Sequence, residues 1–435
     1  MSKARQIAFN ALCKIERNSS YSNLALDSIL SESELDTRDK SFVSALFYGA
    51  IERKLTLDYN LSLYLSKPLK KLKPELLVLL RMGAYQLLFM EKIPVSAAVN
   101  ETVKLSKKNS LQFASGLINA VLRKVSHNGL CLPEEDDIAE YLSIKYSCNK
   151  WLIEKWLTEY GEYDTEKILE SSLGANTVYI RVNTLKTDSD SLIDSLEAEG
   201  IKAEKTYLDN ALRINFDGNS AENIKAFKNG LFHVQDLACQ LAVKALGVKQ
   251  GDRVFDLCSA PGGKTFTMAE YAGEKGEILA FDIYENRVSL IKKGVSRLGL
   301  SNIKAEVGDA SVHNSEIGLA DKVLCDVPCS GFGIIGKKPE IKYKSKDEAD
   351  EIEKLQYPIL ENAATYVKKG GRLLYSTCTL SKSENEEVCE RFLKEHTDFI
   401  SVTPLSEIST EKFLTLMPHK NGTDGFFIAL FERKE

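Results

Sequence analysis

Two cysteine motifs in the last third of the chain combine residue types that can carry out covalent chemistry. Asp326–Gly331 has the sequence Asp-Val-Pro-Cys-Ser-Gly, and Ser376–Thr379 has the sequence Ser-Thr-Cys-Thr. Each motif follows a short apolar run that predicts a strand. We therefore expect Cys329 and Cys378 at the carboxyl ends of neighbouring strands, the edge at which open α/β sheets bind ligands.

A thiolate at this edge could activate a pyrimidine ring. Carbon 5 of a pyrimidine is a poor nucleophile, but a thiolate that adds to carbon 6 makes carbon 5 able to accept a methyl group. An acid must stabilise the adduct at ring nitrogen 3, and a base must later remove the proton from carbon 5. By residue type alone, Cys329 and Cys378 are equal candidates for the nucleophile. Cys325, inside an apolar strand, is expected to be an inert core residue.

A glycine-rich loop, Cys258–Thr265 (CSAPGGKT), follows another predicted strand and precedes a helix. Its glycines let the backbone approach a ligand closely, and the helix N-terminus offers free N–H groups. A phosphate-binding P-loop needs a glycine where this chain has Cys258, and the dinucleotide pattern GxGxxG is absent. A nucleoside-type ligand such as S-adenosylmethionine remains. The loop residues expected to bind it are Cys258, Ser259, Ala260, Pro261, Gly262, Gly263 and Lys264.

Three carboxylates follow consecutive predicted strands of the same region. Asp282 ends the second strand, where a carboxylate would accept hydrogen bonds from ribose hydroxyls. Asp309 follows the third strand and could meet the adenine amino group. Asp326 ends the fourth strand. A single aspartate here could be a helix cap or turn residue, but the repetition favours a ligand site.

The elements that must position these residues lie in residues 231–435. Short apolar runs alternate with helical segments there, which indicates a parallel sheet with right-handed crossovers. The last run, Gly425–Glu432, has no helix after it and predicts a strand added at the sheet edge. The other runs are Val254–Leu257, Ile278–Phe281, Lys322–Cys325 and Arg372–Tyr375. We expect an α/β, Rossmann-like domain of seven strands.

Two other regions precede this domain. Residues 1–126 show helical spacing of apolar residues and predict an all-α domain, with a basic turn at Lys67–Pro74. Residues 127–230 predict a small α+β connector. In it, Ile138–Tyr160 indicates a helix and Thr177–Val182 a strand.

Composition limits the class of protein. The chain has 435 residues and a net charge of −5, but residues 1–126 carry 19 Lys+Arg against 11 Asp+Glu, a net +8. This asymmetry suggests a module for a polyanion, although a solvated helical surface would also explain it.

The charged N-terminus does not resemble a signal peptide, and the apolar stretch Leu76–Met90 is too short to span a bilayer. Nine cysteines without a Cys-x-x-Cys pair exclude a disulfide framework and a zinc site. We expect a cytoplasmic protein that uses no metal.

The motifs CSAPGGKT, DVPCSG, YSTCTL and DGFFIA resemble those of the RNA cytosine-C5 methyltransferases of the NOL1/NOP2/Sun group. Val99–Val103 and Ile118–Lys124 are similar to the NusB-like RNA-binding domain fused in front of the bacterial Sun/RsmB proteins. Those proteins methylate a cytosine in small-subunit ribosomal RNA. Arg181–Asn183 and Val234–Asp236 also resemble stretches of that family.

The resemblance implies roles that residue types alone leave open. It implies that Cys378 attacks the base, that Cys329 assists elimination, and that Asp326 hydrogen-bonds the cytosine ring and lies beside the cofactor. Arg287 stands where the group often has an arginine at the cofactor, although a role on the helix surface would fit equally well.

The resulting prediction is an S-adenosylmethionine-dependent methyltransferase that modifies carbon 5 of one cytosine in 16S ribosomal RNA, of the type that acts on cytosine 967. The substrate base would lie in a single-stranded loop of naked or partly assembled RNA, because a base must leave its stack to reach the thiol. We expect a monomer.

Three alternatives remain. The same chemistry could act on another RNA, such as transfer RNA. A second alternative is a non-catalytic RNA-binding or antitermination factor, which would need none of Cys329, Cys378 and Asp326. A small-molecule methyltransferase is the third, and the basic first domain argues against it.

Overall fold

The computed structural model describes residues 2–18, 26, 29–30, 33, 35–174, 177–216 and 220–435. The chain forms two compact units. One comprises Met1–Gly174 with Ile335–Lys344, and the other comprises Ala175–Ile334 with Ser345–Glu435. A short segment from the last quarter of the chain therefore belongs to the N-terminal unit.

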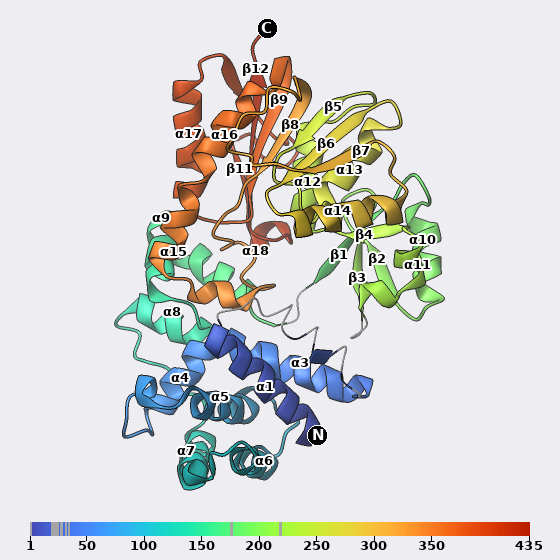
Figure 1. Ribbon diagram of the computed structural model, residues 1–435. Coiled ribbons are helices and arrows are strands. Elements are labelled where there is room, and N and C mark those ends of the chain that lie inside the picture. The colour runs from blue at the N-terminus through green and yellow to red at the C-terminus, as the bar shows by residue number, and fades with distance from the viewer. Residues whose placement is uncertain are drawn as a thin grey trace. The chain divides into compact units, whose positions relative to one another are not determined.

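The first unit is helical, which includes residues 1–126 as predicted. Its helices α1 to α9 run from blue to teal in Figure 1, and its segment Ile335–Lys344 is orange. Apolar residues at helical spacing form its core, including Ala4, Ala8 and Ala11 on α1. Local signals set the helix starts: the Asp36 carboxylate accepts the Asp39 N–H at the start of α3, and Pro74 begins α5. The helices are α1 (Ser2–Asn18), α3 (Thr37–Glu52), α4 (Lys54–Ser62), α5 (Pro74–Phe89), α6 (Val95–Lys108), α7 (Ser115–Asn128), α8 (Ile138–Tyr146) and α9 (Lys150–Ser171), with 3₁₀ turns η1 (Leu69–Lys71) and η2 (Gln112–Ala114).

The single helix predicted over Ile138–Tyr160 is wrong in one respect, because the structure has two helices, α8 and α9, in this region. Ser147 ends α8 in the left-handed region, at φ 55°. Its hydroxyl accepts the Leu55 N–H at 2.8 Å, a contact with a residue distant in sequence that periodicity does not reveal.

The segment Ile335–Lys344 completes the helical unit. Its 3₁₀ turn η4 (Pro339–Tyr343) places Tyr343 so that the phenol donates to the Ile51 carbonyl at 2.6 Å. The Asn149 N–H donates to the Lys342 carbonyl at 3.1 Å. These bonds fix a piece of chain that begins six residues after Cys329.

Strands between residues 178 and 234 form a four-stranded antiparallel sheet in the second unit, with the order β2-β3-β1-β4. Residues 127–174 of the predicted connector belong to the helical unit instead. The strands are β1 (Val178–Val182), β2 (Lys202–Lys205), β3 (Ala211–Asn215) and β4 (Phe232–Val234). Helices α10 (Ser189–Glu197) and α11 (Lys225–Lys228) accompany it, with the 3₁₀ turn η3 (Ala221–Asn223).

The larger sheet of the second unit carries the predicted site. Its order is β10-β12-β9-β8-β5-β6-β7, and β11 pairs with β12. Strands β5 to β9 are parallel, and their residues alternate between two cores. Val254 and Leu324 face one core, and Phe255 and Val323 face the other. The strands are β5 (Arg253–Asp256), β6 (Glu277–Asp282), β7 (Ile303–Val307), β8 (Ala320–Asp326), β9 (Val367–Thr377), β10 (Phe399–Val402), β11 (Leu414–Leu416) and β12 (Phe426–Arg433).

Helices cover both faces of this sheet, as a Rossmann-like fold requires (Figure 1). Helices α12 (Leu237–Leu246), α13 (Gly263–Ala272) and α14 (Glu285–Leu298) contribute to one core. Helices α16 (Gln356–Thr365) and α17 (Glu386–Glu395) contribute to the other. The remaining helical elements of this unit are α15 (Lys346–Glu353), α18 (Pro418–Asn421) and the 3₁₀ turn η5 (Lys382–Glu384).

Two details of the predicted sheet are corrected. The final strand β12 is internal rather than at the edge, because it lies antiparallel between β9 and β10. Successive residues of β12 face the two cores in turn, Phe426 one and Phe427 the other, which explains why Phe426–Phe431 is buried on both faces. The sheet also has eight strands instead of seven, since β11 adds a short pairing with β12.

Candidate functional site

The two predicted thiols meet at the carboxyl edge of the sheet. Cys329 follows β8 and Cys378 follows β9, which pair in parallel with Asp326 opposite Ser376. The two Sγ atoms are 3.2 Å apart. The Gly333 N–H donates to the Cys378 carbonyl at 2.9 Å, which ties the two loops together through the backbone.

A buried carboxylate, Glu384, holds both thiol loops. Its oxygens accept the Ser330 N–H at 2.8 Å, the Ser330 hydroxyl at 2.5 Å and the Gln356 amide at 2.9 Å. The Thr379 hydroxyl also donates to it, at 3.3 Å. Sequence reasoning missed this residue, because Glu384 is one acid in a polar stretch and no local pattern sets it apart. Its 1% exposure is what distinguishes it.

A close backbone approach explains the glycine of the DGFFIA motif. The Gly425 N–H donates to the Gly333 carbonyl at 2.9 Å. A Cβ on Gly425 would lie 2.7 Å from the Gly333 Cα, and a Cβ on Gly333 would lie 1.9 Å from the Gly425 carbonyl oxygen, so a side chain at either position would force this contact apart.

The environment of Cys329 keeps its thiol protonated. The hydrogen bond with Cys378 and burial both raise the pKa of Cys329 well above its ordinary value. At neutral pH the Cys329 thiol is therefore a hydrogen-bond donor beside the Cys378 sulfur.

Asp326 is held by two donors. The Lys264 ammonium donates to Oδ2 at 2.6 Å, and the Ser376 hydroxyl donates to Oδ1 at 2.7 Å. Burial alone would lower the pKa of Lys264, but the charge and hydrogen bond of Asp326, together with Cys239 and Asp256, outweigh burial and hold that pKa above its ordinary value. A charged ammonium of the glycine loop thus lies beside the carboxylate.

The glycine loop joins β5 to α13. The Ala260–Pro261 bond is cis, and Gly262 has φ +111°. A Cβ at Gly262 would lie 2.4 Å from the Phe266 ring, so glycine is required there by both conformation and space. The Ser259 N–H and hydroxyl each donate to the Phe281 carbonyl at 2.8 Å, which attaches the loop to the next strand.

Most of the predicted loop residues surround one cavity of about 210 Å³. Lys264 and Asp326 also line it, as do five residues that were not predicted to bind the cofactor: Val234, Gln235, Asp236, Cys239 and Asp256. The signal for Asp256 was available, because an acid ends the apolar run immediately before the loop. The predicted loop residues at this cavity are Cys258, Ser259, Ala260, Pro261, Gly263 and Lys264.

Asp282 and Arg287 lie together. Arg287 Nη1 is 3.2 Å from the Asp282 carboxylate, and Nη2 donates to the Ala260 carbonyl at 2.9 Å. Arg287 therefore links the second strand to the glycine loop. Asp282 is almost fully buried, and the Tyr284 N–H donates to its Oδ1 at 3.2 Å.

Asp309 lies at a second cavity of about 400 Å³, next to Gly308, Ala310 and Phe281. Its Oδ1 accepts both the N–H and the hydroxyl of Ser311, at 2.9 and 2.7 Å. Those hydrogen bonds lower the pKa of Asp309. Asp309 thus stabilises a turn through Oδ1. Its second carboxylate oxygen, Oδ2, remains for a ligand.

Comparison with known proteins places this chain. Residues 243–432 match the model for 16S rRNA methyltransferase RsmB/F, residues 2–127 match the NusB family, and residues 148–219 match the ferredoxin-like domain of the RsmF/B-like methyltransferases. The probable ribosomal RNA small subunit methyltransferase B of Bacillus subtilis is 38% identical over 99% of this chain and 98% of its own length. The chain belongs to the RsmB/F methyltransferase family.

Other similarities agree with this assignment. The probable methyltransferase B of Synechocystis is 34% identical over 99% of this chain and of its own length. The crystal structure described as PH0851 superposes with a TM-score of 0.84 at 30% identity, covering 98% of this chain and 99% of that one. This RsmB/F-family protein is an S-adenosylmethionine-dependent rRNA methyltransferase with a NusB domain, a ferredoxin-like connector and a Rossmann-like catalytic domain.

The smaller cavity suits the methionine end of that cofactor. Two buried polar atoms of its lining, Asp256 Oδ1 and Gln235 Nε2, have no hydrogen-bond partner in the structure. Burial raises the pKa of Asp256 to about 7, which indicates that a cation there would be favourable. A ligand ammonium group would donate to Asp256 Oδ1, and a ligand carboxylate would accept from Gln235 Nε2. The cavity of this RsmB/F-family protein therefore fits an amino-acid moiety.

Within the part of the chain that the structure describes, no group of three or more His, Cys, Asp or Glu residues could hold a metal ion. The same residues contain no helix that is long and apolar enough to cross a membrane.

Proposed function

We propose that this protein methylates carbon 5 of a cytosine in 16S rRNA, of the type at position 967, through a covalent adduct between Cys378 and carbon 6. The observation that carries the proposal is the 3.2 Å approach of the Cys329 and Cys378 sulfurs beside the Lys264–Asp326 pair. A binding module or a simple N- or O-methyltransferase requires no paired thiols.

Addition of a thiolate to carbon 6 moves electron density to ring nitrogen 3, which must then accept a hydrogen bond or a proton. Asp326 is the carboxyl group at the thiol edge and is the partner we propose for that position, and the charged Lys264 next to it holds it there. S-adenosylmethionine, when bound, supplies the methyl group to the activated carbon 5.

The two thiols are given different roles on the family resemblance. The contact with Cys378 and burial raise the pKa of Cys329, so a protonated Cys329 thiol can donate a hydrogen bond to the Cys378 sulfur. Once a base removes the proton from carbon 5, the ring double bond re-forms and the Cys378 sulfur leaves carbon 6. The Cys329 thiol can then stabilise the departing sulfur. With the family resemblance, we assign attack to Cys378 and assistance of elimination to Cys329.

The cofactor-binding roles of the predicted residues belong to the same proposal. Gly262 and Gly263 give the backbone access to the ligand, Asp282 accepts the ribose hydroxyls, and Asp309 meets the adenine. Arg287 keeps Asp282 and the loop in position.

The test uses the full-length protein, cofactor carrying a labelled methyl group, and protein-free 16S rRNA, followed by mapping of 5-methylcytosine. The expected result is one modified cytosine in 16S rRNA. Methylation of transfer RNA alone would support the alternative substrate. Methylation at a site other than carbon 5 would refute the thiol mechanism.

A further inference from the structure

The paired thiols have a chemical property that methyl transfer does not use. The Cys329 and Cys378 sulfurs are 3.2 Å apart. The two sulfurs of a disulfide are about 2.05 Å apart, so a further approach of roughly 1.2 Å allows a covalent bond between them. Methyl transfer needs both groups as free thiols. A bond between the sulfurs is therefore a modification of the site and not a step of the reaction.

The loops around the two thiols hold them side by side. The hydroxyl oxygens of Ser330 and Thr379, the residues directly after the two cysteines, are 2.7 Å apart. Both hydroxyls also donate to the Glu384 carboxylate, at 2.5 and 3.3 Å. Because the Gly333 N–H donates to the Cys378 carbonyl at 2.9 Å, the loops cannot separate without breaking these bonds. Each sulfur therefore meets the other at a high effective concentration.

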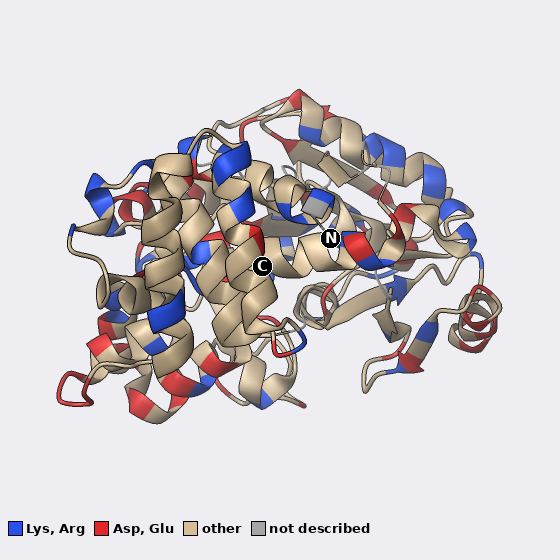
Figure 2. Cartoon of the chain, turned by 90° about the horizontal axis from the view of Figure 1, so that it is seen from below, with Lys and Arg blue, Asp and Glu red and all other residues tan. Residues whose placement is uncertain are grey.

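A small oxidant can reach the pair. Cys329 and Cys378 are both partly exposed, whereas Cys325 and Cys389 are buried. Hydrogen peroxide is uncharged, so the charged side chains that are spread over the chain (Figure 2) do not steer it toward or away from the thiols. Oxidation of a cysteine follows its exposure and its thiolate character. The pair meets the first condition by its position, and a thiolate is also the form that attack on a base requires.

We propose that a peroxide converts Cys329 and Cys378 into a reversible disulfide, and that this bond switches methyl transfer off. A thiolate of the pair attacks one peroxide oxygen, the O–O bond breaks and hydroxide leaves, which yields a sulfenic acid. The sulfur of the other cysteine then displaces the sulfenic hydroxyl group, which leaves as water with the proton of that cysteine. The hydroxide takes up the proton that the first thiol released. The two sulfurs lose two electrons in total, and the peroxide is reduced to two molecules of water.

The disulfide has two consequences for the enzyme. It occupies both sulfurs, so neither can attack carbon 6 or assist elimination. This effect on activity rests on the proposed function, whereas formation of the bond rests on the geometry of the two sulfurs. The second thiol also captures the sulfenic acid before more peroxide converts it to a sulfinic acid, a form that thiols do not reduce.

The first experiment treats the full-length protein with hydrogen peroxide in the absence of RNA. Remaining thiols are blocked with iodoacetamide, and the peptides are mapped by mass spectrometry. The expected product is a pair of peptides linked through Cys329 and Cys378. Dithiothreitol should remove the link and restore the untreated rate of 16S rRNA methylation. Loss of activity without this link, or a link from either residue to a different cysteine, would overturn the proposal.

A matched variant, Cys329→Ser, removes one sulfur and keeps a side chain of similar size. Peroxide should then carry Cys378 past the sulfenic acid to the sulfinic acid, a gain of two oxygen atoms that dithiothreitol does not reverse. The mass of the Cys378 peptide is the measurement, so the activity of the variant does not enter. Oxidation of Cys378 that stays fully reversible in this variant would show that Cys329 is not its partner.

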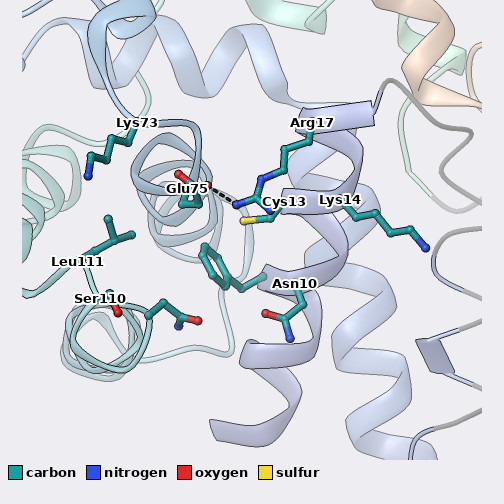
Figure 3. A pocket seen from close by; sticks show the side chains of 10 residues that line it. Asn10, Cys13, Lys14, Arg17, Lys73, Glu75, Ser110 and Leu111 are labelled. Carbon is teal, nitrogen blue, oxygen red and sulfur yellow. Dashed lines mark hydrogen bonds and ion pairs between the residues drawn. The ribbon is translucent and has the colours of Figure 1, made fainter.

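Cys13 supplies an internal control in the helical unit. It lines an open pocket of about 640 Å³ among α1, the start of α5 and the turn between α6 and η2, and it is the only cysteine among the described residues of that lining. Figure 3 shows its side chain beside the ion pair of Arg17 and Glu75. Burial and the charge of Glu75 raise the pKa of Cys13 to about 12, so this thiol stays protonated. Cys13 should remain a free thiol at peroxide concentrations that link the pair, and equal loss of its thiol would refute a selective switch.

The disulfide and the proposed function can fail separately. Formation of the link in a protein that methylates no cytosine of 16S rRNA would refute the proposed function and leave the disulfide standing. Methylation at the full rate by protein in which the pair is linked would overturn the switch.

Discussion

The sulfur atoms of Cys329 and Cys378 lie 3.2 Å apart at the ends of two parallel strands. At this distance one thiol can donate a hydrogen bond to the other sulfur, so the two groups titrate together as a pair. Burial adds to the effect and keeps the proton on Cys329. The geometry therefore couples the two cysteines, and their separate roles need a variant of each.

The first prediction separates the two thiols. Cys378→Ser should abolish methylation, because a hydroxyl is far less nucleophilic than a thiolate, and should form no covalent complex with RNA. Cys329→Ala should still attack and methylate but fail to release the product. A denaturing gel with radiolabelled RNA should then show a cofactor-dependent band, which the double variant loses. A covalent band from the Cys378 variant and none from the Cys329 variant would reverse the assignment.

The second prediction concerns the ribose acceptor. Asp282→Ala should weaken S-adenosylmethionine binding by roughly 1–3 kcal/mol, the range for leaving ligand donors unsatisfied. Arg287→Ala keeps the carboxylate and should weaken binding less, since Arg287 acts through Asp282 and the Ala260 carbonyl. Calorimetry without RNA measures both, with circular dichroism as the folding control. Equal affinity of the folded Asp282 variant and the wild type would remove the ribose assignment.

The third prediction follows from the buried carboxyl of Asp256. Burial raises its pKa from 3.8 in the unfolded chain to about 7 in the folded one. Between these values the folded protein holds a proton that the unfolded protein has lost, so the free energy of unfolding falls as pH rises through this window. The loss is on the order of 4 kcal/mol at about 1.4 kcal/mol per pH unit.

Asp256→Asn stays neutral at every pH and should remove this contribution. Urea unfolding without the cofactor, at pH values near 5 and near 8, measures it. The advantage of the variant over the wild type should grow toward the higher pH. An equal difference in free energy of unfolding between the variant and the wild type at both pH values would show that Asp256 ionises normally.

The fourth prediction tests Glu384 as a positioning residue. Glu384→Gln places an amide donor where the carboxylate now accepts from Ser330 and Gln356. The thiol loops should shift, and kcat should fall by about 10- to 100-fold, the scale of an ångström-sized displacement. Cofactor affinity should not change, because Glu384 does not line the cofactor cavity.

The matched control for this prediction is Glu387→Gln, an exposed acid three residues further along the chain. It should keep wild-type kcat. A Glu384 variant with unchanged kcat, or with equal losses in kcat and cofactor affinity, would contradict the positioning role.

The sequence alone established the local features of this protein. Strand–loop–helix alternation, the glycine loop and the carboxylates at strand ends are readable because each depends on a few consecutive residues. The same reasoning placed Cys329 and Cys378 at neighbouring strand ends, since parallel strands share one carboxyl edge. Family motifs then indicated the chemistry.

Only the tertiary structure decided how distant segments meet. It brought Glu384 under both thiol loops, placed β12 inside the sheet, and put Ile335–Lys344 in the helical unit through Tyr343. It also joined three separate segments into the pocket that Cys13 lines. These relations depend on hydrogen bonds and packing between residues tens to hundreds of positions apart, and no periodicity along the chain encodes such pairings.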